Sequence, residues 1–157
     1  MNNDFEKAKE CAFWYINKRR YTKKELIDKL ISREYERELS LEVADYLEEL
    51  GYIDDRDYAR RYIIDAVKLK KRGLKRIKAD LSLKGIPYDV VDSIVLEFNI
   101  DCDEALPQLV ESKASSLNLD DEKQRGKLVS FLLRRGFSYS DIIEEIREYT
   151  LKREKID

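Results

Sequence analysis

The chain has 157 residues and a formal net charge of −2, and its 43% hydrophobic and 41% charged residues allow a buried core beneath a strongly charged exterior. It contains no histidine, which excludes imidazole acid–base chemistry, Ser-His and Cys-His nucleophile pairs and histidine-bearing metal sites. Its five glycines are scattered and none lies in a phosphate-cradling loop, so we expect neither an enzyme nor a cofactor.

Apolar residues recur with the period of an α-helix along the chain, and nothing alternates with period two for long enough to form a strand. We predict helices near residues 4–19, 22–33, 40–50, 55–71, 74–84, 87–98, 102–117, 121–135 and 138–150. Thr22 and Glu25 form a capping box at the start of the second helix. Gly51, Gly85 and Gly136 suit the left-handed residue that ends a helix. The predicted fold class is therefore all-α.

The pattern of these helices repeats every 51 residues. Leu30, Leu81 and Leu132 lie at this interval, each with an apolar residue four positions before it and a base three positions after it. A turn position and a large apolar residue then follow. The matching sets are Leu26, Ile77 and Leu128; Arg33, Lys84 and Arg135; Glu34, Gly85 and Gly136; Tyr35, Ile86 and Phe137. The three leucines should therefore be equivalent buried positions.

Three copies of this pattern nearly fill the chain. We predict three tandem three-helix repeats, covering residues 1–53, 54–101 and 102–157, joined by short links into an elongated, slightly curved rod. Such repeats build an extended surface rather than a pocket, which favours binding over catalysis. Each unit also resembles a helix-turn-helix module, so nucleic acid remains a candidate partner.

Positive charge is concentrated between residues 68 and 78, where seven bases occur in eleven residues with no acid. Such concentrations bind polyanions or acidic protein surfaces. Bases also complement the negative end of a helix dipole, but that explains only some of a run that continues into the next helix. Arg19, Arg20, Lys23 and Lys24 form a smaller cluster. The candidate partner-binding residues are Lys68, Lys70, Lys71, Arg72, Lys75, Arg76, Lys78, Lys84, Arg134 and Arg135.

Two other groups of residues have structural explanations. The acidic run at residues 54–57, and the pair Asp101 and Asp103, could share a cation but lack the glycine turn of a calcium loop. Both precede predicted helices, so we interpret them as helix caps, and we expect no metal site. Phe13, Trp14 and Tyr15 could stack on nucleic-acid bases. Adjacent aromatic residues on a helix point in different directions, so we place Tyr15 in the core.

No feature of the chain indicates a membrane or a secreted protein. No apolar run approaches the roughly 20 residues needed to cross a bilayer. The first four residues lack the basic-then-apolar pattern of a secretory signal. Cys11 and Cys102 each lie within a helical pattern, so two reduced thiols are expected. We expect a cytoplasmic protein.

Three blocks of sequence, in order, resemble the RecX regulatory proteins of bacteria. The first is Thr22-x-x-Glu25-Leu26-x-x-Lys29-Leu30. The second runs from Gly51-Tyr52-Ile53-Asp54-Asp55-x-x-Tyr58-Ala59-x-x-Tyr62 through Lys71-x-Gly73-x-x-Arg76-Ile77-x-x-x-Leu81-x-x-Lys84-Gly85-Ile86. The third is Lys127-Leu128-x-x-Phe131-Leu132-x-Arg134-Arg135-Gly136-Phe137-Ser138. The resemblance extends from about Ala8 to Tyr149.

This resemblance implies a modulator of the RecA recombinase. Members of the family bind RecA, lie in the helical groove of its filament on single-stranded DNA, and mostly inhibit strand exchange, ATP hydrolysis and co-protease activity. The chain would then limit recombination and the SOS response as a monomer, with at most weak direct binding to DNA. The alternatives are a helix-turn-helix-like DNA-binding protein, or a helical adaptor for another protein.

Overall fold

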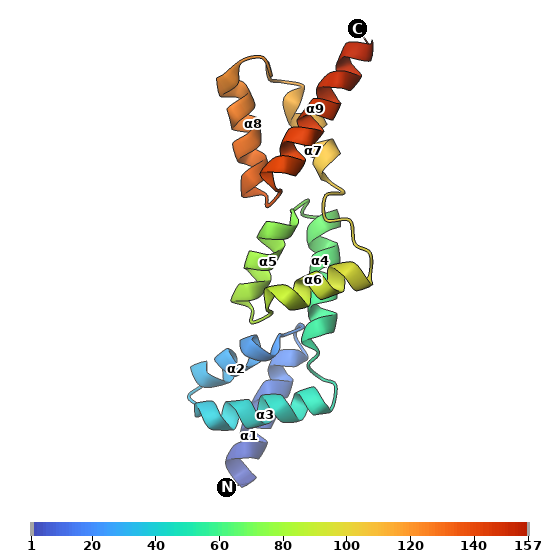
Figure 1. Ribbon diagram of the computed structural model, residues 1–157. Coiled ribbons are helices and arrows are strands. Elements are labelled where there is room, and N and C mark those ends of the chain that lie inside the picture. The colour runs from blue at the N-terminus through green and yellow to red at the C-terminus, as the bar shows by residue number, and fades with distance from the viewer. Residues whose placement is uncertain (1, 157) are drawn as a thin grey trace. The chain divides into compact units, whose positions relative to one another are not determined.

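The computed structural model describes residues 2–156, which form helices and connecting turns with no strand among them (Figure 1). The helices are α1 Asn2–Ile16, α2 Lys23–Ser32, α3 Arg37–Glu49, α4 Asp55–Lys68, α5 Leu74–Leu83, α6 Tyr88–Glu97, α7 Leu106–Ala114, α8 Glu122–Arg134 and α9 Tyr139–Ile156. None of these has the length and apolar content that crossing a bilayer requires. The predicted all-α class is confirmed.

Several helix ends differ from the predicted ranges for physical reasons. Helix α4 ends at Lys68 rather than 71, because Lys71 adopts a left-handed conformation with φ of 53°. Helix α7 begins at Leu106 rather than 102, because residues 102–105 form turns instead. Helix α9 continues past residue 150 to Ile156 through a charged segment where apolar periodicity gave no signal.

The chain divides by its internal contacts into two compact units. Unit 1 contains residues up to 61 together with 81–94, and unit 2 contains 62–80 together with the chain from 95 onward. Helices α4, α5 and α6 each contribute residues to both units. The domain boundaries at 53/54 and 101/102 stay a prediction.

Unit 1 contains a core built by α1, α2 and α3, which all pack against one another. Its fully buried side chains include Ala8, Ala12, Leu26, Leu30, Val43, Ala44 and Leu47. Tyr15 is also buried, as predicted, whereas Trp14 is 54% exposed. Cys11 lies at the edge of this core as a thiol. The aromatic run Phe13–Tyr15 therefore mainly serves packing, with Trp14 as its exposed member.

Unit 2 contains an equivalent core built by α7, α8 and α9. Val110, Leu128, Leu132, Phe137 and Ile142 are almost completely buried there. Leu30, Leu81 and Leu132 are each 0% exposed and each lies in the second helix of its repeat, so the 51-residue register of buried positions is confirmed. 

The turn after each of these leucines also repeats. Glu34, Gly85 and Gly136 have φ values of 71°, 90° and 103°, so the same position is left-handed in all three repeats. This conformation ends a helix and suits glycine, because a Cβ atom there approaches the following carbonyl oxygen. The predicted left-handed stops at Gly85 and Gly136, and at Gly51 with φ of 84°, are confirmed.

Within unit 1, this turn contacts the beginning of α2. The buried Thr22 hydroxyl accepts from the Glu25 backbone N–H at 3.1 Å and donates to the Lys84 carbonyl oxygen at 2.6 Å. The Glu25 carboxylate accepts from the Thr22 N–H at 3.0 Å, which completes the predicted capping box. A Cβ on Gly85 would lie 2.5 Å from Cβ of Lys24, so the turn approaches α2 closely.

Within unit 2, the equivalent turn contacts the beginning of α5. The Gly73 N–H donates to the Arg135 carbonyl oxygen at 2.8 Å, and the Lys75 N–H donates to the Gly136 carbonyl oxygen at 3.1 Å. A Cβ on Gly73 would lie 2.5 Å from backbone atoms of Gly136, so only glycine fits at this position. Gly73 is therefore required for a close approach of two turns, while Lys71 is the left-handed residue that ends α4.

Candidate partner-binding surface

The basic stretch, Lys68–Lys78, covers the end of α4, the following turn and the first residues of α5. The turn is formed by backbone bonds, since the Lys70 N–H donates to the Asp65 carbonyl oxygen and the Arg72 N–H to that of Ala66. The chain then passes through the left-handed conformation of Lys71 and enters α5 at Leu74. The bases of the stretch therefore point in several directions and have different surroundings.

Two of these bases are held by an acid just beyond the stretch. The Arg72 guanidinium lies 3.0 Å from the Asp80 carboxylate and Arg76 lies 3.5 Å from it. The Tyr62 hydroxyl donates to the same carboxylate at 3.2 Å. Side chains of Arg72 and Asp80 are only 25% and 22% exposed. This network joins α4 to α5 within unit 2, so Arg72 contributes more to folding than to an external surface.

Arg135 is also committed to internal contacts. Its Nε donates to the Lys71 carbonyl oxygen at 3.1 Å, and its Nη2 donates to that of Lys70. Arg76 reaches the other way, with Nη1 donating to the Arg134 carbonyl oxygen at 3.3 Å. These bonds bring the end of α8 against the basic stretch. Arg134 and Arg135, which are distant from the basic stretch in the sequence, therefore lie next to it in unit 2.

Three bases at this junction keep exposed charge. Lys71, Lys75 and Arg134, here termed the base cluster, form no ion pair with any residue in the range 2–156. Lys75 and Arg134 are exposed and Lys71 is half-buried. The backbone N–H of Gly73 donates to Arg135 and the side chain of Arg76 donates to Arg134, so the segments that carry these three residues lie against each other. They are the strongest candidates for contact with an anionic partner.

The remaining candidate bases are less available. Lys68 pairs with Glu104 at 3.6 Å, and Lys70 lies over the Tyr62 ring, 5.6 Å from its centroid. Lys84 belongs to unit 1, where it pairs with Glu25 at 3.4 Å. Burial lowers the pKa of Lys84, but Glu25 and Tyr58 outweigh it and hold that pKa above its usual value. Lys84 therefore stabilises unit 1 rather than extending the base cluster.

Lys78 lines a cavity in unit 2 together with Lys75 and three acids. The cavity has a volume of about 320 Å³, and its acids are Asp101, Asp103 and Asp141. Burial, and a hydrogen bond with the Asp141 carboxylate, raise the pKa of Asp103 to about 6.

The two acidic groups that the sequence analysis interpreted as helix caps have different outcomes. The Asp101 carboxylate accepts from the Asp103 N–H at 3.0 Å, which is a turn contact rather than the predicted helix cap, because α7 begins later. By contrast, Asp54 accepts from the Asp57 N–H at 3.0 Å at the start of α4, as predicted.

Helix α8 carries further exposed bases, Lys123 and Lys127, outside the set of candidates predicted from the sequence. Lys123, Gly126, Lys127, Ser130 and Arg134 line an open groove of about 720 Å³, here termed the α8 groove. None of its three bases has an ion-pair partner among the described residues. The detectable signal was the spacing i, i+4, i+7 and i+11 from Lys123, which places polar residues on one helical face. The α8 groove extends the base cluster through their common residue, Arg134.

The smaller basic cluster of unit 1 is largely neutralised. Lys23 bridges Asp45 at 2.5 Å and Glu48 at 3.2 Å, and Lys24 pairs with Asp28 at 3.0 Å. The Arg19 guanidinium lies 3.7 Å from the Tyr21 ring centroid. These contacts account for three of the four bases within unit 1.

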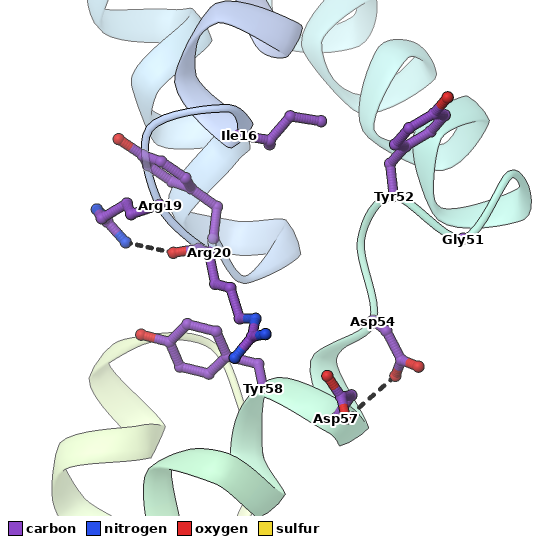
Figure 2. Close-up of a pocket in the computed structure, with 9 residues that line it drawn as sticks. Ile16, Arg19, Arg20, Gly51, Tyr52, Asp54, Asp57 and Tyr58 are labelled. Atoms are coloured by element: carbon purple, nitrogen blue, oxygen red, sulfur yellow. Dashed lines mark hydrogen bonds between the residues drawn. The ribbon is translucent and has the colours of Figure 1, made fainter.

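Arg20 lines a small pocket of about 190 Å³ in unit 1, together with Tyr52, Tyr58 and Asp57. Figure 2 shows the Arg20 side chain directed toward Tyr58, and Arg19 donating to the Arg20 carbonyl oxygen. The Asp57 carboxylate is already paired with Arg60 and Arg61. This pocket mixes both charges at small size, so it is a weaker candidate for a polyanion than the surface of unit 2.

Comparison with known proteins identifies the family to which these features belong. Models of the first, second and third three-helix domains of RecX match residues 8–47, 54–93 and 101–144. The regulatory protein RecX of Clostridium botulinum (strain Eklund 17B / Type B) is 30% identical over 155 residues, covering 96% of this chain and 72% of that protein. The regulatory protein RecX of Chlorobium limicola is 33% identical, covering 88% of this chain and 87% of that protein.

A solved structure gives the same result for the fold. The crystal structure of RecX from Lactobacillus salivarius superimposes with a TM-score of 0.84 at 29% identity, covering 96% of this chain and 99% of that one. A second crystal structure of a regulatory protein RecX gives a TM-score of 0.77 at 23% identity. The three-helix repeats inferred from the 51-residue register are thus the three-helix domains of these proteins.

Proposed function

Because the chain belongs to the RecX family of regulatory proteins, we propose that it binds RecA and RecA filaments on single-stranded DNA, and that it lowers their activity. Bound to the filament, the protein slows DNA-dependent ATP hydrolysis, strand exchange and co-protease activity without catalysing a reaction of its own. In the cytoplasm this limits recombination and the SOS response.

The observation that carries this proposal is the assembly of the base cluster from two repeats. Lys71 and Lys75 come from the middle repeat and Arg134 comes from the third, and the Gly73–Arg135 backbone bond joins the two segments that carry them. Charged side chains that have no internal partner contribute little to stability, so their accumulation is explained best by an external anionic surface. Contacts from successive repeats then add through high effective concentration.

The test uses a charge-reversal pair and a matched control. Lys75→Glu combined with Arg134→Glu reverses two exposed bases of the cluster, and Arg147→Glu combined with Lys155→Glu makes the same charge change on exposed residues of α9. Half-inhibition of the RecA ATPase on single-stranded DNA should require about tenfold more of the first variant, which corresponds to about 1.4 kcal/mol. The control pair should inhibit like the parent. Equal inhibition by parent and cluster variant would contradict the role of the base cluster.

Binding measurements separate the alternatives. The parent should be retained by RecA filaments more strongly than by bare single-stranded DNA, and inhibition should persist at 0.2 M salt. A DNA-binding protein would instead be retained by bare DNA, with an affinity that falls steeply as salt rises. A helical adaptor for another protein would bind neither RecA nor DNA and would leave the ATPase rate unchanged.

A further inference from the structure

The α8 groove contains a glycine that the fold of the chain does not require. Gly126 lies in the interior of α8, and its backbone is not left-handed. Apart from its two chain neighbours and the adjacent backbone of α8 itself, no atom of the described residues lies within 4 Å of the position that a Cβ would occupy there. Glycine in a helix interior costs about 1 kcal/mol relative to alanine. Neither backbone conformation nor internal packing therefore requires a glycine at Gly126.

The residues around Gly126 have a consistent character. Ser130 lies one helical turn further along α8, and Lys123, Lys127 and Arg134 complete the lining of the groove. The lining is therefore two small residues flanked by three bases, without an acid or an aromatic side chain. Along α8 as a whole, Glu122 is the one acid beside four bases. An anionic partner would complement the charge of this lining, and the small side chains of Gly126 and Ser130 leave room for it to approach the α8 backbone closely.

We infer that the α8 groove docks an acidic α-helix of a protein partner. A rise of 1.5 Å per residue separates Lys123 from Lys127 by about 6 Å along the axis, and Lys127 from Arg134 by about 10 Å. Carboxylates at positions i, i+4 and i+11 of a partner helix have the same separations and pair with the three bases. Small residues at a contact allow two helix axes to approach each other closely.

A single-stranded nucleic acid fits the same groove less well. Surfaces that bind such strands combine bases with aromatic side chains on which nucleotides stack. The lining of the α8 groove supplies the bases but no aromatic ring. Phosphates need no close approach to the helix backbone, so they leave Gly126 unexplained. The inferred docking of an acidic helix rests on the proposed function in one respect, which is that the partner is a protein.

The experiment measures binding of two fluorescent peptides to the full chain. The first is a helical alanine-rich peptide with glutamates at i, i+4 and i+11, and the second has the same composition with glutamates at i, i+2 and i+5. A single-stranded oligothymidylate serves as the nucleic-acid probe. The matched peptide should bind about tenfold more tightly than the respaced one. Equal binding of the two peptides, or no binding of either, would overturn the inference.

Two variants test the close approach of the helices and the charge pairing separately. Gly126→Leu places a larger side chain in the groove without changing charge, and Gly126 is exposed with open space at the position of a Cβ. Lys127→Glu reverses the central base. Each should weaken the matched peptide about tenfold, while Arg125→Glu, outside the groove lining, should change it less than about twofold.

The pattern of losses decides the class of partner. If the oligothymidylate binds and is lost in Lys127→Glu but not in Gly126→Leu, the groove takes phosphates and the inference is wrong. If Gly126→Leu leaves peptide binding unchanged, close helix approach is refuted. These measurements contain no RecA, so their failure leaves the ATPase test of the proposed function unaffected, and failure of the ATPase test leaves these results unaffected.

Discussion

The backbone N–H of Gly73 donates to the carbonyl oxygen of Arg135 at 2.8 Å, in the same register in which the Thr22 hydroxyl donates to the carbonyl oxygen of Lys84 at 2.6 Å. Each donor precedes the second helix of its repeat, and each acceptor precedes the left-handed turn of the following repeat. The contact between consecutive repeats is therefore itself repeated. It is made by a side-chain hydroxyl in unit 1 and by a backbone amide in unit 2.

Gly73→Ala should destabilise unit 2. The new methyl group would lie 2.5 Å from the Gly136 carbonyl, and neither backbone segment can yield without breaking the Gly73–Arg135 bond. Such overpacking costs about 1–3 kcal/mol. Chemical unfolding of the full chain measures the loss.

Gly126→Ala is the matched control for this substitution. Its methyl group meets open space in α8, so helix propensity should raise stability by up to about 1 kcal/mol. If both variants shifted stability in the same direction, the close approach of the two turns would not be a determinant of the fold.

Thr22→Val should destabilise unit 1 by removing one hydroxyl with two hydrogen bonds. The Glu25 N–H and the Lys84 carbonyl oxygen would both lose their partner at a fully buried position. Leaving a buried polar group unsatisfied costs about 1–3 kcal/mol. Valine has nearly the volume of threonine, so packing is conserved. Thr22→Ser retains the hydroxyl and should lose less, and amide hydrogen exchange in α2 should rise only in the valine variant.

Glu34→Gly should stabilise unit 1. Glu34 has φ of 71° where the other two repeats have glycine, and a left-handed conformation costs a residue other than glycine about 1–2 kcal/mol. Part of this gain is offset by the greater entropy of glycine in the unfolded chain, so the melting temperature should rise by a few degrees. Glu38→Gly, in the first turn of α3, should lower it. A fall in both variants would show that Glu34 is not strained.

The repeat, the core and the turn chemistry could be predicted from the sequence because they depend on local patterns. Leu30, Leu81 and Leu132 are buried because each lies on the apolar face of a helix. The spacing of apolar residues along the sequence is enough to reveal such a face. The left-handed position at Gly85 and Gly136 was visible for a similar reason, because glycine is the residue that such a turn favours.

The candidate surface was only partly predictable, because its contacts are made to backbone atoms distant in sequence. Arg135 donates to the carbonyl oxygen of Lys71, 64 residues away. Every residue has a backbone carbonyl oxygen, so the residue types in the sequence do not indicate which one is bound. The basic stretch could be recognised in the sequence, but only some of the ion pairs that neutralise its bases could be predicted. The pairing of Arg76 with Asp80 follows helical i, i+4 spacing, whereas the pairing of Arg72 with the same acid depends on the turn geometry.

Asp103→Asn should change how the stability of unit 2 depends on pH. The pKa of Asp103 rises from 3.8 to about 6, first through burial and then through the hydrogen bond with Asp141. A raised carboxyl pKa means that the folded state binds the proton more tightly than the unfolded state. The stabilisation is complete below pH 3.8 and is lost as the pH rises through about 6.

Asparagine resembles the protonated carboxyl and keeps a donor for Asp141 at every pH. The difference in unfolding free energy between Asp103→Asn and the parent should therefore be small at pH 4 and should grow in favour of the variant up to pH 7. Denaturant unfolding at four pH values measures this difference, with the exposed Asp120→Asn as the control. A difference that does not vary with pH would mean that Asp103 and Asp141 share no proton in the folded chain.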